Sequence, residues 1–236
     1  MSGNHAETAL SLTPVRGTWR EILSTIFDSF QDHNRIATVP KTVFSMVVNP
    51  KNRVIEEQQG PFDLDNYAMR DDAQGQDSWL CVVANVRVGR DWFKVRIFLS
   101  SIDKDRTAIE IQFPSLVYES VYAFYEDNKE IDEAVKFDLI QFCVDISAAV
   151  GAEGFGYDYT MVHKVLGPPK ISSLEQWVDN DPTRPAQLPD QWILAGVLAS
   201  LIDIAQLRAR DGIQPHVYEL GGYTIYDLLW PSVLNE

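Results

Sequence analysis

The sequence predicts an α+β fold in which a mainly antiparallel β-sheet carries helices packed on one face. Two alternating apolar segments, 78–88 and 91–100, flank a two-residue turn, which is the pattern of a β-hairpin. A third alternating segment at 107–113 extends this hairpin into an antiparallel meander. Apolar residues at helical spacing over 129–150 then predict a long helix that lies across one face of the sheet.

The first predicted element is a helix over 18–31. Thr18 and Glu21 have the spacing of a capping box, in which each side chain bonds to the backbone of the other residue. The residues before this helix form a polar start that lacks the basic region and the apolar run of a signal peptide, which predicts a cytoplasmic protein. The apolar positions of the helix are Trp19, Ile22, Leu23, Ile26, Phe27 and Phe30.

The next segments are a strand, a loop and the hairpin. Residues 42–49 are predicted to form a strand, and the polar, Asp-rich stretch 50–77 is predicted to be a loop. The hairpin turns at Gly89-Arg90, where a glycine in the first position favours a type II′ turn. That turn fixes the register, which pairs Val88 with Asp91, Val86 with Phe93, Ala84 with Val95, Val82 with Ile97 and Leu80 with Leu99.

The two faces of the hairpin differ in polarity. One face is almost continuously aliphatic, and we expect it to be buried. We expect the other face to be partly solvated because it carries Asn85, Arg87, Trp92, Lys94 and Arg96.

The middle of the chain is less clear in its pattern. Residues 115–127 fit a helix or a strand equally well. Asp127 and Glu130 have the spacing of the capping and third positions of a helix, so the long helix is predicted to begin near 129. Gly151 is well placed to end it. Its apolar stripe is Ile131, Val135, Leu139, Phe142, Ile146 and Val150.

The stretch EGFGYDYTMVH, residues 153–163, combines glycines with acidic, aromatic and histidine side chains. Its glycines follow a predicted helix, whereas a dinucleotide-binding loop follows a strand, so a phosphate site is not expected. As a strand it places Asp158 and His163 on opposite faces, because their separation is odd. We therefore predict a structural strand with an aromatic inner face.

The C-terminal third begins with a proline-rich connection over 171–191. Residues 192–212 fit either one long helix or a strand followed by a short helix near 203–210. Two aromatic-rich runs around Gly221-Gly222 predict a hairpin that closes the sheet or forms its edge.

Length and charge limit the classes of protein. The 236 residues suit one domain over 1–236, or two subdomains over 1–126 and 127–236. The formal net charge of −14 disfavours binding to nucleic acid and to anionic membranes. Cys81 and Cys143 lie in apolar surroundings without metal-ligand spacing, so we expect free buried thiols, no metal and no cofactor.

The C-terminal third resembles a known class of proteins. The ending ELGGYTIYDLLWP after the apolar segment WILAGVLASL resembles immunity proteins of bacterial polymorphic toxin and type VI secretion systems, in the family paired with restriction-endonuclease-like toxins. The resemblance implies a non-catalytic cytoplasmic protein that binds one cognate toxin, a nuclease, by occluding its active site or blocking its assembly. An acidic inhibitor suits such a partner, because a nuclease carries a basic substrate groove.

Two acidic segments are candidate toxin contacts, because aromatic anchors with charged surroundings are typical of protein interfaces. Two alternatives stay open, a small cytosolic hydrolase that uses His163 or His216 with a carboxylate, and a non-catalytic adaptor. The oligomeric state is left open by the sequence. The candidate contacts are Asp71, Asp72, Asp77, Trp177, Asp179 and Asp181.

Overall fold

The computed structural model describes most of the chain. The described residues are 7–36, 42–49, 53–61, 78–103, 105–114, 122–125, 128–160, 192–200 and 215–227.

The described strands form one ten-stranded sheet and one two-stranded hairpin. The large sheet has the order β11-β12-β10-β9-β1-β6-β5-β4-β2-β3, and every neighbouring pair is antiparallel. The short hairpin pairs β7 with β8. The strands are β1 (Glu7–Arg16), β2 (Thr42–Asn49), β3 (Arg53–Pro61), β4 (Ser78–Val88), β5 (Asp91–Ser101), β6 (Arg106–Pro114), β7 (Tyr122–Tyr125), β8 (Asn128–Ile131), β9 (Gly154–Thr160), β10 (Trp192–Leu198), β11 (His216–Leu220) and β12 (Tyr223–Asp227).

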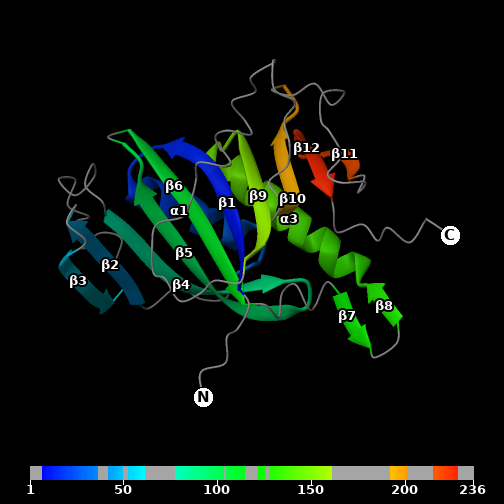
Figure 1. Ribbon diagram of the computed structural model, residues 1–236, viewed down its shortest axis with the longest axis horizontal. Coiled ribbons are helices and arrows are strands. Elements are labelled where there is room, and N and C mark those ends of the chain that lie inside the picture. Colours follow the sequence, from blue (N-terminus) through cyan, green and yellow to red (C-terminus); the bar gives the residue numbers. More distant parts are fainter. Residues whose placement is uncertain are drawn as a thin grey trace.

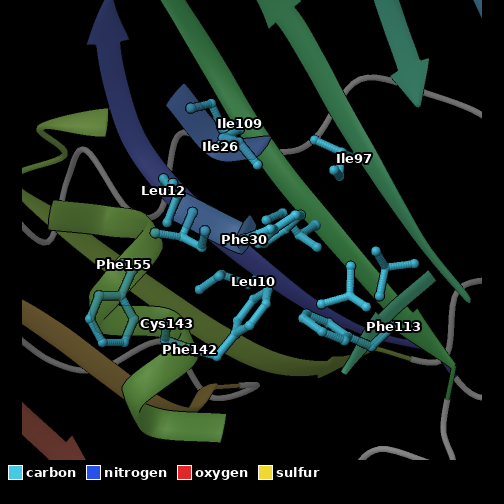
Figure 2. Close-up of a cluster of buried hydrophobic side chains, with 14 of the residues drawn as sticks. Leu10, Leu12, Ile26, Phe30, Ile97, Ile109, Phe113, Phe142, Cys143 and Phe155 are labelled. Carbon is cyan, nitrogen blue, oxygen red and sulfur yellow. The ribbon is translucent and has the colours of Figure 1, made fainter. Parts of the chain in front are cut away.

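Two helices, α1 (Trp19–Asp32) and α3 (Glu133–Val150), lie behind the sheet in Figure 1, on the same face. The core fills the space between this face and the helices. Phe30 of α1 stacks on Phe142 of α3, with ring centroids 5.6 Å apart, and Phe113 of β6 meets the same Phe142 ring edge to face at 5.4 Å. Figure 2 shows these rings among the aliphatic side chains of the central strands. The expected α+β class, a mainly antiparallel sheet with helices on one face, is confirmed.

Several elements match the sequence prediction closely. The capping box of Thr18 and Glu21 is formed at the start of α1, and all five expected β4–β5 pairs are present in the expected register. Gly89 has φ +62°, whereas Arg90 is not among the described residues with positive φ, which is the combination of a type II′ turn. Gly151 ends α3 in the left-handed conformation.

Besides β8, which is described with the long helix below, the sequence does not predict the strands β1 and β3. The polar start contains β1, which lies between β6 and β9 in the middle of the sheet. Leu10 and Leu12 lie on the helix-covered face of β1 and are both fully buried in the core. Their spacing of two residues, which is typical of a strand, is visible in the sequence. The expected loop over 50–77 contains β3, which lies at the edge of the sheet beside β2, where polar sequences are common. Residues 62–77 lie outside the described part.

The long helix begins later than predicted. Residues 128–131 pair with β7, and Asp132 rather than Asp127 caps α3, because its carboxylate accepts hydrogen bonds from the backbone N–H groups of Ala134 and Val135. Of the predicted stripe, Val135, Leu139, Phe142 and Ile146 are buried.

The C-terminal ambiguity resolves in favour of the strand. Residues 192–198 form β10, which pairs with β9 and β12, and the predicted short helix near 203–210 lies outside the described residues. Gly196 is required in β10, because a Cβ at this position would collide with the ring of Phe155. The predicted hairpin is present as β11 and β12, and β11 forms one edge of the large sheet. The division into subdomains stays a prediction, although β1 and β9, from either side of that boundary, pair directly.

A buried arginine joins α1, α3 and the β4–β5 hairpin. Arg35 follows α1, and its guanidinium forms two hydrogen bonds of 3.0 Å to the two carboxylate oxygens of Asp138 on α3. The Asp138 Oδ2 atom also accepts a hydrogen bond of 2.6 Å from the backbone N–H of Gly89 in the hairpin turn. The backbone oxygen of Arg35 accepts from the N–H of Arg87 at 2.9 Å. The guanidinium lies 5.3 Å from the centroid of the Phe142 ring.

We predict that Arg35→Met lowers the free energy of unfolding by about 3–5 kcal/mol, because it leaves the buried Asp145 carboxylate, 3.6 Å from the guanidinium, without this cation and removes the partner of Asp138. Urea unfolding followed by circular dichroism measures this loss. The matched control is Arg16→Met, since Arg16 is exposed at the end of β1 and its loss should change stability by less than about 0.5 kcal/mol. Equal effects of the two substitutions would contradict the role given to Arg35.

Candidate binding surface

The β4–β5 hairpin presents polar and aromatic side chains on the face of the sheet opposite the helices. Within the ladder, Arg87 lies directly opposite Trp92, and Asn85 lies opposite Lys94. All four are exposed, and the Trp92 side chain is 50% accessible. We call this set, together with Arg90 in the turn and Arg96 of β5, the hairpin surface.

The hairpin surface is held rigid from the other side of the sheet. Gly89 lies so close to α3 that an added Cβ would be 3.0 Å from the Val135 side chain. The same residue donates its N–H to Asp138, and the aliphatic residues on the inner face of both strands are buried in the core. A side chain such as Trp92 therefore stands on a fixed backbone, which lowers the conformational entropy lost when a partner binds.

The charge of the hairpin surface is opposite to that of the whole chain. Residues 85–96 contain Arg87, Arg90, Lys94 and Arg96 but a single acid, Asp91. Within the described ranges no carboxylate forms an ion pair with Arg87, Arg90 or Lys94. In a protein with a formal net charge of −14, this creates a local positive field.

A second group of charges lies buried on the helix side, between α3 and the β11–β12 hairpin. The Nζ atom of Lys136 is 2.8 Å from the Oδ2 atom of Asp227, and their side chains are only 3% and 1% exposed. Glu133 is 3.8 Å from the same Nζ but is 62% exposed. Burial, with the negative charge of Asp227 nearby, raises the pKa of Tyr218. The pair joins the start of α3 to the end of the sheet.

Of the two histidines that the sequence offers as candidate catalytic residues, the structure describes only His216. It lies directly opposite Asp227 in the β11–β12 ladder and is exposed. Its ring centroid is 5.2 Å from that of Tyr218. The Asp227 carboxylate is already bound by Lys136 at 2.8 Å, so its charge is neutralised within the protein and is less able to orient or activate a histidine.

An open groove lies at the C-terminal end of β1, near the start of α1. Its volume is about 790 Å³, and Arg16, Thr18, Glu21, Asp103 and Arg106 are among its lining residues. Hydrogen bonds within the protein engage most of these groups. Glu21 and Thr18 cap α1, and Asp103 accepts a bond of 2.6 Å from the Nε of Arg106. The groove is therefore a polar surface whose charges are largely compensated.

The predicted site residues are mostly not placed by the structure. Asp71, Asp72, Asp77, Trp177, Asp179 and Asp181 all lie outside the described residues, as does His163. The sequence predicts the polar face of the β4–β5 hairpin only as a partly solvated surface. The available signal was the run of four basic residues around Trp92 in an otherwise acidic chain.

Both cysteines belong to the described part of the chain. Cys81 and Cys143 are free and buried, and burial raises the pKa of the Cys81 thiol to about 12. No set of three or more His, Cys, Asp or Glu side chains in the described ranges is arranged to hold a metal ion. Neither of the two described helices has the length and apolar character needed to cross a bilayer.

Comparisons of the chain with models of known protein families, with curated proteins and with solved structures find no match.

We predict that Lys136→Met lowers the free energy of unfolding by about 3–5 kcal/mol, because it removes the cation from the buried carboxylate of Asp227. Chemical denaturation compares this variant with Glu133→Gln, which changes an exposed neighbour of the same lysine and should cost less than about 0.5 kcal/mol.

The double variant Lys136→Met/Asp227→Leu tests the cause of that loss. It should recover most of the stability, because a buried ion pair replaced by apolar groups of similar size is close to neutral. If the separate effects of Lys136→Met and Asp227→Leu simply add in the double variant, the loss of stability does not come from the ion pair.

Proposed function

We propose that this protein is a non-catalytic immunity protein that binds and neutralises one cognate secreted toxin, a nuclease, and that the hairpin surface is part of the contact. The observation that carries the proposal is Trp92. This side chain is half exposed on a rigid hairpin and stands opposite Arg87. Trp and Arg are the residue types most enriched among the energetically dominant positions of protein interfaces.

The rest of the surface supports the same proposal. Packing against α3 and the core fixes the backbone under Trp92 before a partner arrives, which favours tight binding. The charges around it are suited to a polar rim that selects one partner and accelerates encounter. The excess of acidic residues over the whole chain supports a partner with a basic groove, as a nuclease has.

We predict that Trp92→Ala weakens binding of the partner by about 2 kcal/mol or more, close to thirtyfold in Kd. The tagged protein is first used to capture its partner from the native cells, at low salt and again near ~0.5 M salt, with identification by mass spectrometry. The captured partner is then expressed in a sensitive host, and rescue of growth by the wild-type protein and by each variant is scored.

The matched control for this experiment is Phe137→Ala. Phe137 is an aromatic residue of α3 that is 55% exposed, and its removal should leave both binding and rescue unchanged. A captured, stoichiometric partner that is not toxic would contradict the immunity function. Full rescue of growth by Trp92→Ala would show that the hairpin surface is not part of the contact with the toxin.

A hydrolase remains the competing function, because His216 faces Asp227 across the ladder. The proposal predicts that His216→Ala binds and neutralises the toxin like the wild-type protein. It also predicts no turnover of a generic ester such as p-nitrophenyl acetate beyond the buffer rate. Ester hydrolysis that disappears in His216→Ala would favour the enzyme instead.

A further inference from the structure

We infer that the hairpin surface takes an acidic protein segment, so that the contact it makes with the toxin is with carboxylates rather than with a basic groove. This inference rests on the proposed function for the identity of the partner. The surface and its chemistry are argued from the β4–β5 hairpin alone.

The first argument is charge complementarity. Arg87, Arg90 and Lys94 have no carboxylate partner within the part of the chain that the structure describes. The formal charge of the chain is −14, so the chain as a whole repels an acidic partner, whereas the cations of the hairpin surface attract it. Such a local reversal directs one orientation of approach, because like charges elsewhere disfavour the alternatives.

The second argument is the arrangement of donors around the ring. Arg87 and Trp92 form one cross-strand pair, and Asn85 and Lys94 form the next pair on the same face. Directly opposite residues in an antiparallel ladder have Cβ atoms about 5 Å apart. An arginine fork, a lysine and an amide are thus grouped beside one aromatic anchor. A guanidinium binds a carboxylate with two parallel hydrogen bonds, which matches the side chains of Asp and Glu.

The third argument separates an acidic protein from a nucleic acid. Nucleic acids are bound through many regularly spaced phosphates, which requires an extended basic track. Here the cations of the hairpin surface lie on a single hairpin, and the neighbouring strand β6 presents Glu110 and Gln112 on the same face. A short segment with a few carboxylates fits this area better than a polyanion does.

The test uses the full chain and a fluorescein-labelled peptide of alternating Glu and Leu, followed by fluorescence anisotropy. We expect the peptide to bind the wild-type protein at ~0.01 M salt and to lose most of that affinity at ~1 M, because the Debye length falls from about 30 Å to about 3 Å. Arg87→Glu/Lys94→Glu should weaken binding about tenfold or more.

Arg16→Glu/Arg20→Glu is the matched control, because it changes the net charge by the same amount through exposed residues. Arg16 lies opposite Arg106, at the end of the β5–β6 pair remote from the Gly89-Arg90 turn. The affinity of this control should stay close to that of the wild-type protein. Equal losses in the two double variants would overturn the inference, since overall charge would then explain the binding. Tighter binding of labelled oligothymidylate than of the peptide would also overturn it, as would a dimer of this chain that the Arg87→Glu/Lys94→Glu change dissociates.

The same variants separate this inference from the proposed function. Growth rescue that Trp92→Ala abolishes, but that Arg87→Glu/Lys94→Glu leaves intact or improves, would retain the immunity function and overturn the acidic contact. A captured partner without toxicity, combined with peptide binding that depends on Arg87 and Lys94, would retain the acidic contact and overturn the immunity function.

Discussion

The bidentate ion pair between Arg35 and Asp138 is the interaction on which the arrangement of helices and hairpin depends. It brings together the end of α1, the first half of α3 and the β4–β5 turn, which are far apart in the sequence. The guanidinium is buried and the carboxylate is partly exposed, and such a pair contributes little net stability compared with apolar packing, because desolvation offsets much of the attraction. Its effect is positional, since a planar fork satisfied by two oxygens tolerates only one relative orientation of the elements that carry it.

The consequence of this placement is a hairpin with two different environments. Its inner face is packed on α3 and fixed at Gly89, whereas its outer face holds exposed cations and Trp92 on the backbone thus fixed. The Lys136–Asp227 pair fixes the other end of the sheet in a similar way, with both charges buried. The described part of the chain therefore keeps one set of charges for internal alignment and leaves another set at the surface.

The sequence predicts those elements whose local signals agree with their tertiary environment. The β4–β5 register followed from Gly89 and the alternation of Val and Ile, and α1 from its capping box. The predicted start of α3 was wrong because Asp127 and Asp132 offer similar capping signals in the sequence. Only the pairing of β7 with β8 decides between them. The ion pairs were beyond prediction, since they join residues about 100 apart whose charges look like ordinary surface charges in the sequence. For the same reason the polar face of β4–β5 was recognised, but the absence of carboxylate ion pairs to Arg87, Arg90 and Lys94 within the described residues was not.

The position of β1 has a consequence for how the protein is made. This strand precedes both of its neighbours in the chain, which follow about 100 and about 150 residues later, as the pairings of Leu10 with Ile111 and with Tyr157 show. A chain emerging from the ribosome at about 5–20 residues per second carries β1 for several seconds with no edge to pair with. The β4–β5–β6 meander is local and can form as soon as it is made, whereas β1 cannot join the sheet until β6 is available. An unpaired strand whose leucines are exposed in this state is the segment to which a chaperone would bind, or through which nascent chains would aggregate.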